Sequence, residues 1–576
     1  MDSREFREKL RRTLLESSHR VLLRIVPSPA GNSSVELTGK DILDRSSALA
    51  ERHAMPRTPS VVLLLLPHCP ELFLLQIGLV LRGHLPAILP WPTRRMDVEK
   101  YQRNLLHQLQ DLPADQLITI PKLAENLGAG LSYPVSSCAI ENAAEFERSF
   151  ARAFTAGPEV AAARRDARSF VPPGDEALFL QFSGGTTGTQ KAVVVTAAML
   201  SAQLERLQRA LDFGEGDGVV SWLPLYHDMG LIACLWFPLW FGVPSLHFAA
   251  SDWLLNPETL FQQVEQFRGT FCWLPNFAFS YLEQRRTNMK RPYSLAHVRA
   301  CINCSEPVRL RSIRNFAERF ADWGIREESL QASYAMAENV FAVTQSCLGK
   351  PLATFPRSRV QALGGSHLDL AFGLLDDVFV SSGAMLVDNR IRIVDGAAAC
   401  EDGRPGEIQI QTPSLFQGYW GSGGFRTAAF TDDGWYATGD YGFASGGQLY
   451  VIGRIKDIVI VGGQNIFPED VEAVVASVEG VYPGRAVAFG VEDEEYGTQA
   501  LAIVAEMRGE FDSEKSQSME EEILRLVLAA IGIAPRHVAV VPERWMVKST
   551  AGKISRHDTM LRFLSEKSGR TQREVQ

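Results

Sequence analysis

One short loop combines residue types that suit the binding of phosphate. Residues 180–191 read LQFSGGTTGTQK, so an apolar run ends at Phe182 and a loop of glycine and hydroxyl residues runs from Ser183 to Lys191. Glycine lets the backbone approach an anion and present successive N–H groups, while hydroxyls add donors and a lysine adds a cation. The spacing fits neither G-x-x-x-x-G-K-[ST] nor the G-x-G-x-x-G dinucleotide fingerprint. The residues predict a phosphate-binding loop, and a flexible surface loop is the alternative.

The elements that must position this loop follow from the apolar pattern between about residues 60 and 335. Runs such as SVVLLLLP (60–67), ALFLQFS (177–183) and GTFCWLP (269–275) are continuously apolar, as strands buried on both faces are. Amphipathic stretches such as PETLFQQVEQF (257–267) separate them. Strands that alternate with helices predict parallel sheets covered by helices. The loop then lies at the end of a buried strand.

The pattern changes twice in the second half of the chain. From about 376 to 453, short strands are bounded by Gly and Asp, which favours a β-rich subdomain. After about 455 the sequence is typical of a small α+β unit. We predict an α/β protein whose N-terminal domain (1–455) contains two parallel α/β sheets and the β-rich subdomain, followed by a small mobile α+β C-terminal domain (456–576).

The composition limits the class of protein. The chain has 576 residues, 58 Lys+Arg and 67 Asp+Glu, for a formal net charge of −9. A hydrophobic fraction of 46% and a charged fraction of 22% exclude a disordered chain. The mild acidity argues against a dedicated nucleic-acid binder, because such proteins usually carry a basic bias.

The sequence suggests neither a secretory signal at the N-terminus nor a membrane span. The N-terminus is charged and has no small-residue cleavage site after its apolar stretch. The longest apolar stretch (60–83) is broken by Pro67, His68, Pro70 and Glu71, well before the roughly 18 residues that a span needs. We expect a cytoplasmic protein without a membrane span.

The eight cysteines are spread singly except for Cys301 and Cys304, which form C-x-x-C. A zinc site needs a second ligand pair at a suitable spacing, and none lies nearby in the sequence. A redox motif needs a thioredoxin-like setting. We expect two buried, reduced thiols at the end of a strand, as is usual in a cytoplasmic protein.

The loop and several further segments together resemble one family. Ser183–Lys191 is similar to the phosphate loop of the adenylate-forming superfamily, which includes acyl-CoA synthetases, luciferases and peptide-synthetase adenylation domains. Segments typical of fatty acyl-AMP ligases follow at Trp222–Gly230 and Trp273–Ala278. The remaining matches are Ser305–Pro307, Tyr334–Glu338, Tyr436–Asp440, Gly453–Asp457 and Thr550–Lys553. The resemblance runs from about residue 35 to 560, in the family's order.

The resemblance implies a reaction and a nucleotide site. The family joins a carboxylate to ATP, with Mg²⁺, giving an acyl adenylate and pyrophosphate. The residues implied for the β- and γ-phosphates are Ser183, Gly185, Thr186, Thr187, Gly188 and Lys191. Glu338 and Thr187 are the implied metal ligands. Asp440 and Arg454 are implied to bind the ribose and the α-phosphate. The residues implied for the adenine site are Tyr334, Ser305, Glu306 and Pro307. Without the resemblance, each residue has an ordinary structural interpretation. Lys191 is then a solvated surface charge, Glu338 a carboxylate at a helix N-terminus, and Asp440 a residue of a turn.

The resemblance also implies residues for the acid and for closure of the site. Lys553 is the expected catalytic lysine, carried into the site by the C-terminal domain, and Lys456 is the expected hinge. His227 is a candidate gate between the ATP and acyl sites. The candidate acid pocket contains Trp222, Asp228, Met229, Trp273, Phe277 and Phe279. Without the resemblance, Lys553 is typical of a surface charge and the apolar residues of ordinary core.

Some positions differ from the family pattern. Gly184 stands where a serine is usual, Gln190 replaces a proline, and residues 462–464 (GGQ) replace a segment that often carries basic residues. Losing one hydrogen bond to a charged group costs about 1.5–3 kcal/mol. The expected acceptor of the acyl group is the phosphopantetheine thiol of an acyl carrier protein. The alternatives are a CoA ligase, an amino-acid-activating enzyme in which Asp228 holds the amine, and a degenerate nucleotide-binding homologue.

Overall fold

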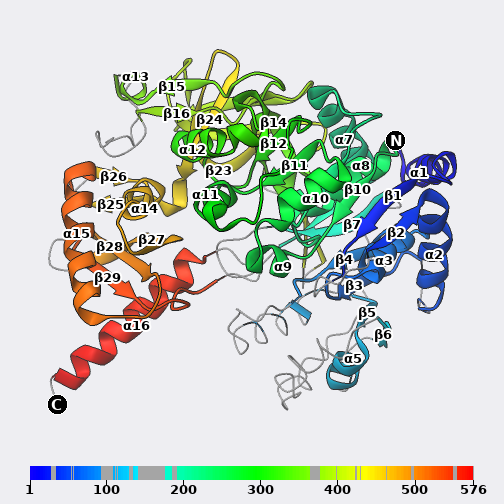
Figure 1. Cartoon of the computed structure of the whole chain (residues 1–576), viewed down its shortest axis with the longest axis horizontal. Coiled ribbons are helices and arrows are strands. Elements are labelled where there is room, and N and C mark those ends of the chain that lie inside the picture. Colours follow the sequence, from blue (N-terminus) through cyan, green and yellow to red (C-terminus); the bar gives the residue numbers. More distant parts are fainter. Residues whose placement is uncertain are drawn as a thin grey trace.

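The structure is a computed structural model of the whole chain (Figure 1). The residues that it describes are 1–27, 34–53, 55, 58–91, 101, 105, 108–109, 112, 114–128, 134–140, 176–183, 191–362, 377–396, 398–421, 424–427, 430–461, 464–493, 498–548 and 554–574. All structural statements below concern these residues.

Two large sheets form most of the molecule. The centre of the first sheet is parallel, in the order β13-β12-β11-β9-β10-β1, and β2 pairs antiparallel at its edge. These strands are β1 (Val21–Ile25), β2 (Val35–Thr38), β9 (Val219–Ser221), β10 (Ser245–His247), β11 (Phe271–Leu274), β12 (Ala300–Asn303) and β13 (Leu330–Ala335). The helices between them include α7 (Ala197–Leu211), α9 (Ala250–Leu255), α10 (Thr259–Phe267), α11 (Asn276–Arg285) and α12 (Leu310–Phe320).

Most of the β-rich segment continues this sheet, while β16 (Val378–Val380) pairs with β15 (Thr354–Pro356) and two further strands join the second large sheet. After β13 the chain reverses through the 3-10 turn at Ala337–Asn339, where Val340 has a φ of 62°, and β14 pairs antiparallel with β13. The sheet then extends in the order β14-β17-β24-β23-β20-β18-β19. These strands are β14 (Ala342–Gln345), β17 (Ala384–Met385), β18 (Arg390–Asp395), β19 (Ala398–Ala399), β20 (Gly406–Gln411), β23 (Tyr436–Ser445) and β24 (Gln448–Arg454).

The second large sheet carries the Gly-rich loop. Its parallel strands are β3 (Val61–Leu65), β4 (Leu85–Ile88), β5 (Gln116–Thr119), β6 (Val135–Ser137) and β7 (Ala177–Phe182). Antiparallel strands complete it, namely β8 (Ala192–Thr196), β21 (Gly418–Gly421) and β22 (Gly424–Thr427). The predicted α/β class with parallel sheets is confirmed, with the addition that both sheets have antiparallel margins.

Helices with apolar surfaces join the two sheets. Phe73, on α3 (Pro70–Leu81), lies 4.9 Å from the ring of His247 on β10. Phe179, on β7, stacks at 5.8 Å on Trp236 of the π-helix Met229–Trp236, which α8 (Phe237–Trp240) continues. α1 (Ser3–Glu16), α2 (Gly39–Glu51) and α5 (Pro121–Gly128) complete this part. Buried aromatic and aliphatic side chains from both sheets therefore form one continuous core.

The chain after β24 forms a smaller lobe with its own core. Its elements are β25 (Val459–Val461), β26 (Gln464–Ile466), α14 (Pro468–Val475), β27 (Val481–Asp493), β28 (Thr498–Met507), α15 (Ser513–Ile531), β29 (His537–Val541) and α16 (Arg556–Glu574). β27, β28 and β29 form a separate sheet, and a cluster of residues between Val459 and Val540 packs beneath it. Figure 1 shows this lobe, in orange and red, beside the larger part. The domain boundary at residue 455 stays a prediction.

Two sequence expectations concern the described residues as a whole. None of the described helices is both long and apolar enough to cross a membrane. Cys301 and Cys304 are both buried and neither is in a disulfide, and they lie on and directly after β12, so the expectation of two buried thiols at a strand end is confirmed.

Candidate active site

The β7–β8 hairpin holds both ends of the predicted phosphate loop. The backbone N–H of Ser183 donates to the carbonyl of Lys191 at 2.8 Å, which closes the base of the loop. Ser183 is buried and Lys191 is exposed. The loop residues named in the sequence analysis, Gly185, Thr186, Thr187 and Gly188, lie outside the described residues, so their role stays a prediction.

Tyr419 lies between Lys191 of the hairpin and the carboxylate of Glu338, which follows β13 of the first sheet. The Nζ of Lys191 lies 4.7 Å from the centre of the Tyr419 ring, on β21. The Tyr419 hydroxyl donates to Oε1 of Glu338 at 2.8 Å and lies 3.3 Å from the hydroxyl of Tyr436. Burial, followed by the Glu338 charge, raises the pKa of Tyr419, so this hydroxyl keeps its proton and holds Glu338. A cation, a carboxylate and two phenols therefore meet beside the loop.

A second charged group lies across the pair β23 and β24, with Asp440 in the middle of β23 and Arg454 at the end of β24. Asp440 and Arg454 are opposite residues of this antiparallel pair, and Arg454 Nε lies 3.1 Å from Asp440 Oδ1. The Tyr334 hydroxyl, from β13, donates to Asp440 Oδ2 at 2.6 Å. Burial raises the pKa of Asp440, although Arg454 and Tyr334 favour its charged form. An acceptor carboxylate thus lies beside a cation and a ring, as a ribose–adenine site requires.

The two groups lie close enough to interact. Burial lowers the pKa of Lys456, and the charges of Arg454 and, more weakly, Lys191 lower it further. The Glu338 and Asp440 charges both raise the pKa of Arg454 against the effect of its burial. Lys191, Glu338, Asp440, Arg454 and Lys456 therefore form one charged cluster, where the hairpin, the first sheet and the link to the small lobe meet.

The predicted adenine segment is held by its backbone conformation and by one carboxylate. Ser305 has a φ of 75°, which turns the chain sharply after β12. Oε2 of Glu306 accepts a hydrogen bond from the N–H of Phe277 at 3.0 Å, at the start of α11. The Glu306 side chain thus caps the start of α11, and its contact with adenine stays a prediction.

The candidate acid-pocket residues fall into two groups. Trp222 stacks on Trp253 at 3.9 Å, and Phe277 lies edge-on to both rings at 6.3 and 6.1 Å. Phe277 is 39% exposed, so this group reaches the surface. Trp273 is fully buried against Phe237 and Phe271, so it packs in the core.

The remaining candidates flank the π-helix. Met229, its first residue, is buried. Asp228 accepts a hydrogen bond from the Met229 N–H at 2.8 Å, and the ring of His227 lies 4.9 Å from the Tyr226 ring. Phe279 is fully buried on α11 against Phe316. Asp228 therefore has a structural partner, and its predicted role as an amine ligand stays a prediction.

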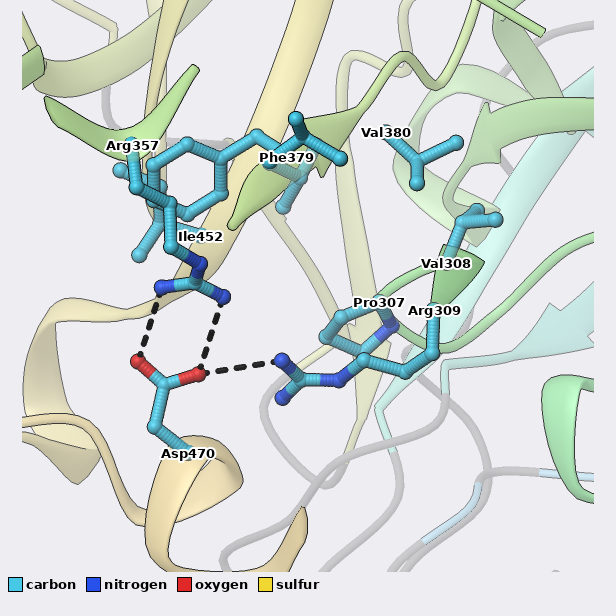
Figure 2. Close-up of a pocket in the computed structure, with 10 residues that line it drawn as sticks. Pro307, Val308, Arg309, Arg357, Phe379, Val380, Ile452 and Asp470 are labelled. Carbon is cyan, nitrogen blue, oxygen red and sulfur yellow. Dashed lines mark hydrogen bonds and ion pairs between the residues drawn. The ribbon is translucent and has the colours of Figure 1, made fainter. Parts of the chain in front are cut away.

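Ion pairs join the small lobe to the large one beside the adenine segment. Asp470, on α14, lies 3.0 Å from Arg309 Nη1 and 3.4 Å from two nitrogens of Arg357, as Figure 2 shows. Arg357 stacks on Phe379 at 4.2 Å and begins α13 (Arg357–Ala362), between β15 (Thr354–Pro356) and β16 (Val378–Val380). These residues line a pocket with Pro307, Val308, Val378, Val380, Val451 and Ile452. Burial alone raises the pKa of Asp470, but the two arginines hold it below its ordinary value.

The charged cluster suits Mg²⁺ only together with a phosphate ligand. Among the described residues no group of three or more His, Cys, Asp or Glu side chains is arranged to hold a metal. Glu338 offers one half-buried carboxylate, already oriented by Tyr419. Magnesium is usually bound by one or two carboxylates plus substrate phosphates and water. The donor set fits that mode, with Glu338 as the protein ligand.

Sequence reasoning missed residues that complete the cluster. Tyr419 lies in a short β run, where aromatic residues are common, so its type alone gave no signal, and Tyr436 lies in the matched Tyr436–Asp440 segment but had no predicted role of its own. Arg309, Arg357 and Asp470 are also absent from the predictions, because pairs so distant in sequence leave no local pattern. Lys553 lies outside the described residues, so its catalytic role stays a prediction.

The two sheets, the separate small lobe and the charged cluster between them define a two-lobed α/β protein with a candidate nucleotide site. The family model described as AMP-binding enzyme matches residues 24–420. The probable long-chain-fatty-acid–AMP ligase FadD30 of Mycobacterium tuberculosis is 30% identical over 416 residues, 66% of this chain and 69% of that protein. The long-chain-fatty-acid–AMP ligase FadD32 of Mycobacterium marinum is 30% identical over 423 residues, 66% and 67% of the two chains.

Solved structures share the fold over nearly the whole chain. A structure from structural and functional studies of fatty acyl-adenylate ligases from E. coli and L. pneumophila matches with a TM-score of 0.78 and 21% identity, over 98% of this chain and 98% of that one. The L. pneumophila enzyme in complex with acyl adenylate and pyrophosphate matches with a TM-score of 0.65 and 22% identity, over 97% of this chain and 96% of that one. This chain belongs to the AMP-binding enzyme family, as the motif order predicts.

Proposed function

We propose that this enzyme activates a fatty acid with ATP, forming an acyl adenylate and releasing pyrophosphate, and then passes the acyl group to the phosphopantetheine thiol of an acyl carrier protein. The observation that carries the first step is the charged cluster of Lys191, Glu338, Asp440 and Arg454, where the predicted phosphate loop and the ribose carboxylate meet. The names of FadD30 and FadD32 support a long-chain fatty acid as the substrate. We also propose the cytoplasm as its location.

The chemistry requires two anions to approach each other. The carboxylate oxygen attacks the α-phosphorus of ATP, the α–β phosphoanhydride bond breaks, and pyrophosphate leaves with the bond's electron pair. Positive charge placed beforehand in a site that excludes water lowers the barrier to such a step. Lys191 and the loop from Ser183 hold the β- and γ-phosphates, and Arg454 lies beside the ribose and α-phosphate. Mg²⁺, when bound through Glu338 and Thr187, neutralises phosphate charge.

The nucleoside is held by groups that are already in place. Asp440 accepts hydrogen bonds from the ribose hydroxyls, Tyr334 stacks on adenine, and the backbone of Ser305, Glu306 and Pro307 lines the base. Because Tyr334 also bonds to Asp440, the ring and the carboxylate are oriented together. Lys553 completes the site from the small lobe by contacting the carboxylate and α-phosphate oxygens.

The acid enters beside the aromatic group. Trp222, Met229 and Phe277 form the acyl pocket, and His227 gates it from the nucleotide. Trp273 is fully buried in the core against Phe237 and Phe271. An aliphatic chain gains free energy mainly by leaving water for such an apolar surface, about 0.8 kcal/mol for each buried CH₂.

Exchange of labelled pyrophosphate into ATP tests the first step. A panel of fatty acids and amino acids is offered to the full chain, and exchange with fatty acids is expected. Exchange with amino acids alone would move the assignment to an amino-acid-activating enzyme, with Asp228 as the amine ligand.

The acceptor is the point on which the relatives' names differ. The putative fatty-acid–CoA ligase fadD25 of Mycobacterium tuberculosis is 29% identical over 415 residues, so a CoA ligase is the second candidate. Thioester formation should be measured with CoA and with a holo acyl carrier protein at equal thiol concentration. The proposal expects acyl transfer to the carrier, and efficient acyl-CoA formation would overturn that half of it.

A further inference from the structure

Two ion pairs bracket the link between the lobes. On one side, Arg454 ends β24 and pairs with Asp440 across the sheet at 3.1 Å. On the other, Asp457 Oδ2 lies 2.6 Å from Arg556 Nη1, at the start of α16. Only Ile455 and Lys456 lie between the two paired residues. A single 3-10 turn spans this link, with the Ile458 N–H donating to the Ile455 carbonyl at 3.3 Å.

Arg556 makes Asp457 part of the framework of the small lobe. Its Nη2 also donates to Glu469 Oε1 at 3.2 Å and to Glu472 Oε1 at 2.9 Å, both on α14. Glu472 Oε1 accepts in addition from the Ala488 N–H of β27 at 3.0 Å. The Arg556 guanidinium therefore connects α16 to the link and to α14. Glu472, which also accepts from β27, connects it to the sheet of the small lobe.

The lobe also approaches β24 closely, one residue before the link's first ion pair. A Cβ at Gly453 would lie 2.9 Å from Cδ1 of Phe467 and 3.1 Å from Oε2 of Glu469. The start of α14 thus packs on the bare backbone at Gly453. Since Glu469 bonds to Arg556 as well, contacts on both sides of the link belong to one network.

We propose that Asp457 and Arg556 form a positioning pair, which confines the freedom between the lobes to Ile455 and Lys456. This inference rests on the proposed function, because it concerns how the lobe is presented to the nucleotide site. Asp457 directly follows Lys456 of the charged cluster and its charge favours the charged forms of Arg454 and Lys456 against their burial, whereas Arg556 binds Asp457 from the small lobe. The pair acts by fixing where the lobe begins, two residues beyond the candidate ribose pair Asp440–Arg454.

Breaking the pair lengthens the free link beyond Asp457. The lobe then samples more orientations, and fewer of them place its residues at the nucleotide. Small misplacements of catalytic groups cost large factors in rate. We expect Asp457→Ala to lower kcat for pyrophosphate exchange by about tenfold with the KM for ATP nearly unchanged, because the nucleotide groups stay in place.

The experiment compares three variants of the full chain. Asp457→Ala removes the pair, Asp457→Asn keeps an acceptor oxygen without the charge, and Glu522→Ala breaks a surface pair with Arg525 in the same lobe as a matched control. Each is measured for kcat and KM in exchange, for ATP affinity by calorimetry, for melting temperature, and for hydrogen exchange of the backbone at 455–461. We expect kcat to be highest in the Glu522→Ala control, lower in Asp457→Asn and lowest in Asp457→Ala. Faster hydrogen exchange at 455–461 is expected in Asp457→Ala only.

Unchanged kcat and unchanged link exchange in a folded Asp457→Ala variant would overturn the proposal. Loss of ATP affinity in that variant would also overturn it, since it would place Asp457 in the nucleotide site. If the parent chain shows no exchange of pyrophosphate with any acid, the proposed function fails, while the hydrogen-exchange comparison still decides whether the pair fixes the link.

Discussion

Tyr419 is the residue that sets the direction of the Glu338 carboxylate. Its hydroxyl donates to Oε1 at 2.8 Å, and its ring lies beneath the Lys191 ammonium. One side chain thus orients the candidate metal ligand and holds the candidate phosphate cation. A carboxylate that is held before the ion arrives loses less freedom when it binds, as partners behind metal ligands generally ensure.

We predict that Tyr419→Phe lowers the rate of adenylate formation by about tenfold and raises the Mg²⁺ concentration needed for half-maximal rate, since partners behind a ligand are commonly worth 10–100-fold. The ring that Lys191 contacts is kept, so the loss isolates the hydroxyl. Titration of the rate with MgCl₂ checks it, with Tyr293→Phe as a control, since the Tyr293 ring packs on Phe261 and Trp323. An unchanged Mg²⁺ requirement would show that the Tyr419 hydroxyl does not affect metal binding through Glu338.

For the helices and strands, the sequence predicts where strands form better than it predicts which strands pair with each other. The apolar run before Ser183 predicts a buried strand, and β7 occupies Ala177–Phe182. The Gly- and Asp-bounded runs from 376 to 453 predict short strands, and they form; their addition to the first sheet depends on β13–β14 and β17–β24 pairing. Strand pairing over such separations is set by tertiary packing, which a local pattern does not contain.

The same limit applies to the candidate site. Tyr334 and Asp440 are 106 positions apart, and only the family resemblance links them before the structure is seen. Lys191 and Arg454 were identified by the same route, whereas Tyr419 lies in a GYW run that is typical of any strand. Residue type and motif order thus predict the reacting groups, while the groups that orient them require the fold.

The α14–α16 contact in the small lobe gives a pH dependence that can be measured. Burial raises the pKa of Glu472 to about 7, against the attraction of Arg556. The unfolded carboxyl has a pKa near 4.3, so between about pH 4 and pH 7 the folded state binds more protons and its stability falls as the pH rises. Glu472→Gln keeps the acceptor oxygen and removes the ionisable carboxyl, so this dependence of stability on pH is lost.

We therefore predict that Glu472→Gln melts at a higher temperature than the parent chain at pH 8, by a few degrees, and that the difference shrinks at pH 5. Differential scanning calorimetry at the two pH values checks it. Glu522→Gln is the control, since Arg525 lowers the pKa of Glu522 and the opposite trend is expected there. A difference that grows towards pH 5 would contradict this account of Glu472.

In the molecule as a whole, the small lobe meets the large part through ion pairs of Asp470 and through apolar packing of Phe467 on Tyr441. Asp470 is the carboxylate that two arginines of the large part share, beside the pocket in Figure 2. Removing one partner of a buried ion pair leaves the others unpaired and typically costs 3–5 kcal/mol. The lobe's own core lies elsewhere, so its fold does not depend on this contact.

We predict that Asp470→Asn loosens the contact between the lobes while both stay folded. Faster cleavage by trypsin in the link around Lys456 and a larger radius of gyration in small-angle scattering are the expected results. Asp512→Asn is the matched control, since Asp512 caps α15 away from the large part. Unchanged cleavage and unchanged scattering would show that Asp470 does not hold the lobe in place.

The central claim is that the cluster beside the β7–β8 hairpin joins a fatty acid to AMP. The most direct measurement is mass detection of the product after the full chain is incubated with ATP, Mg²⁺ and a mixed library of carboxylic acids. We expect a fatty acyl adenylate with an equal amount of pyrophosphate, and loss of both in Lys553→Ala. ATP left intact with every acid offered, or adenylate formation unchanged in Lys553→Ala, would contradict it.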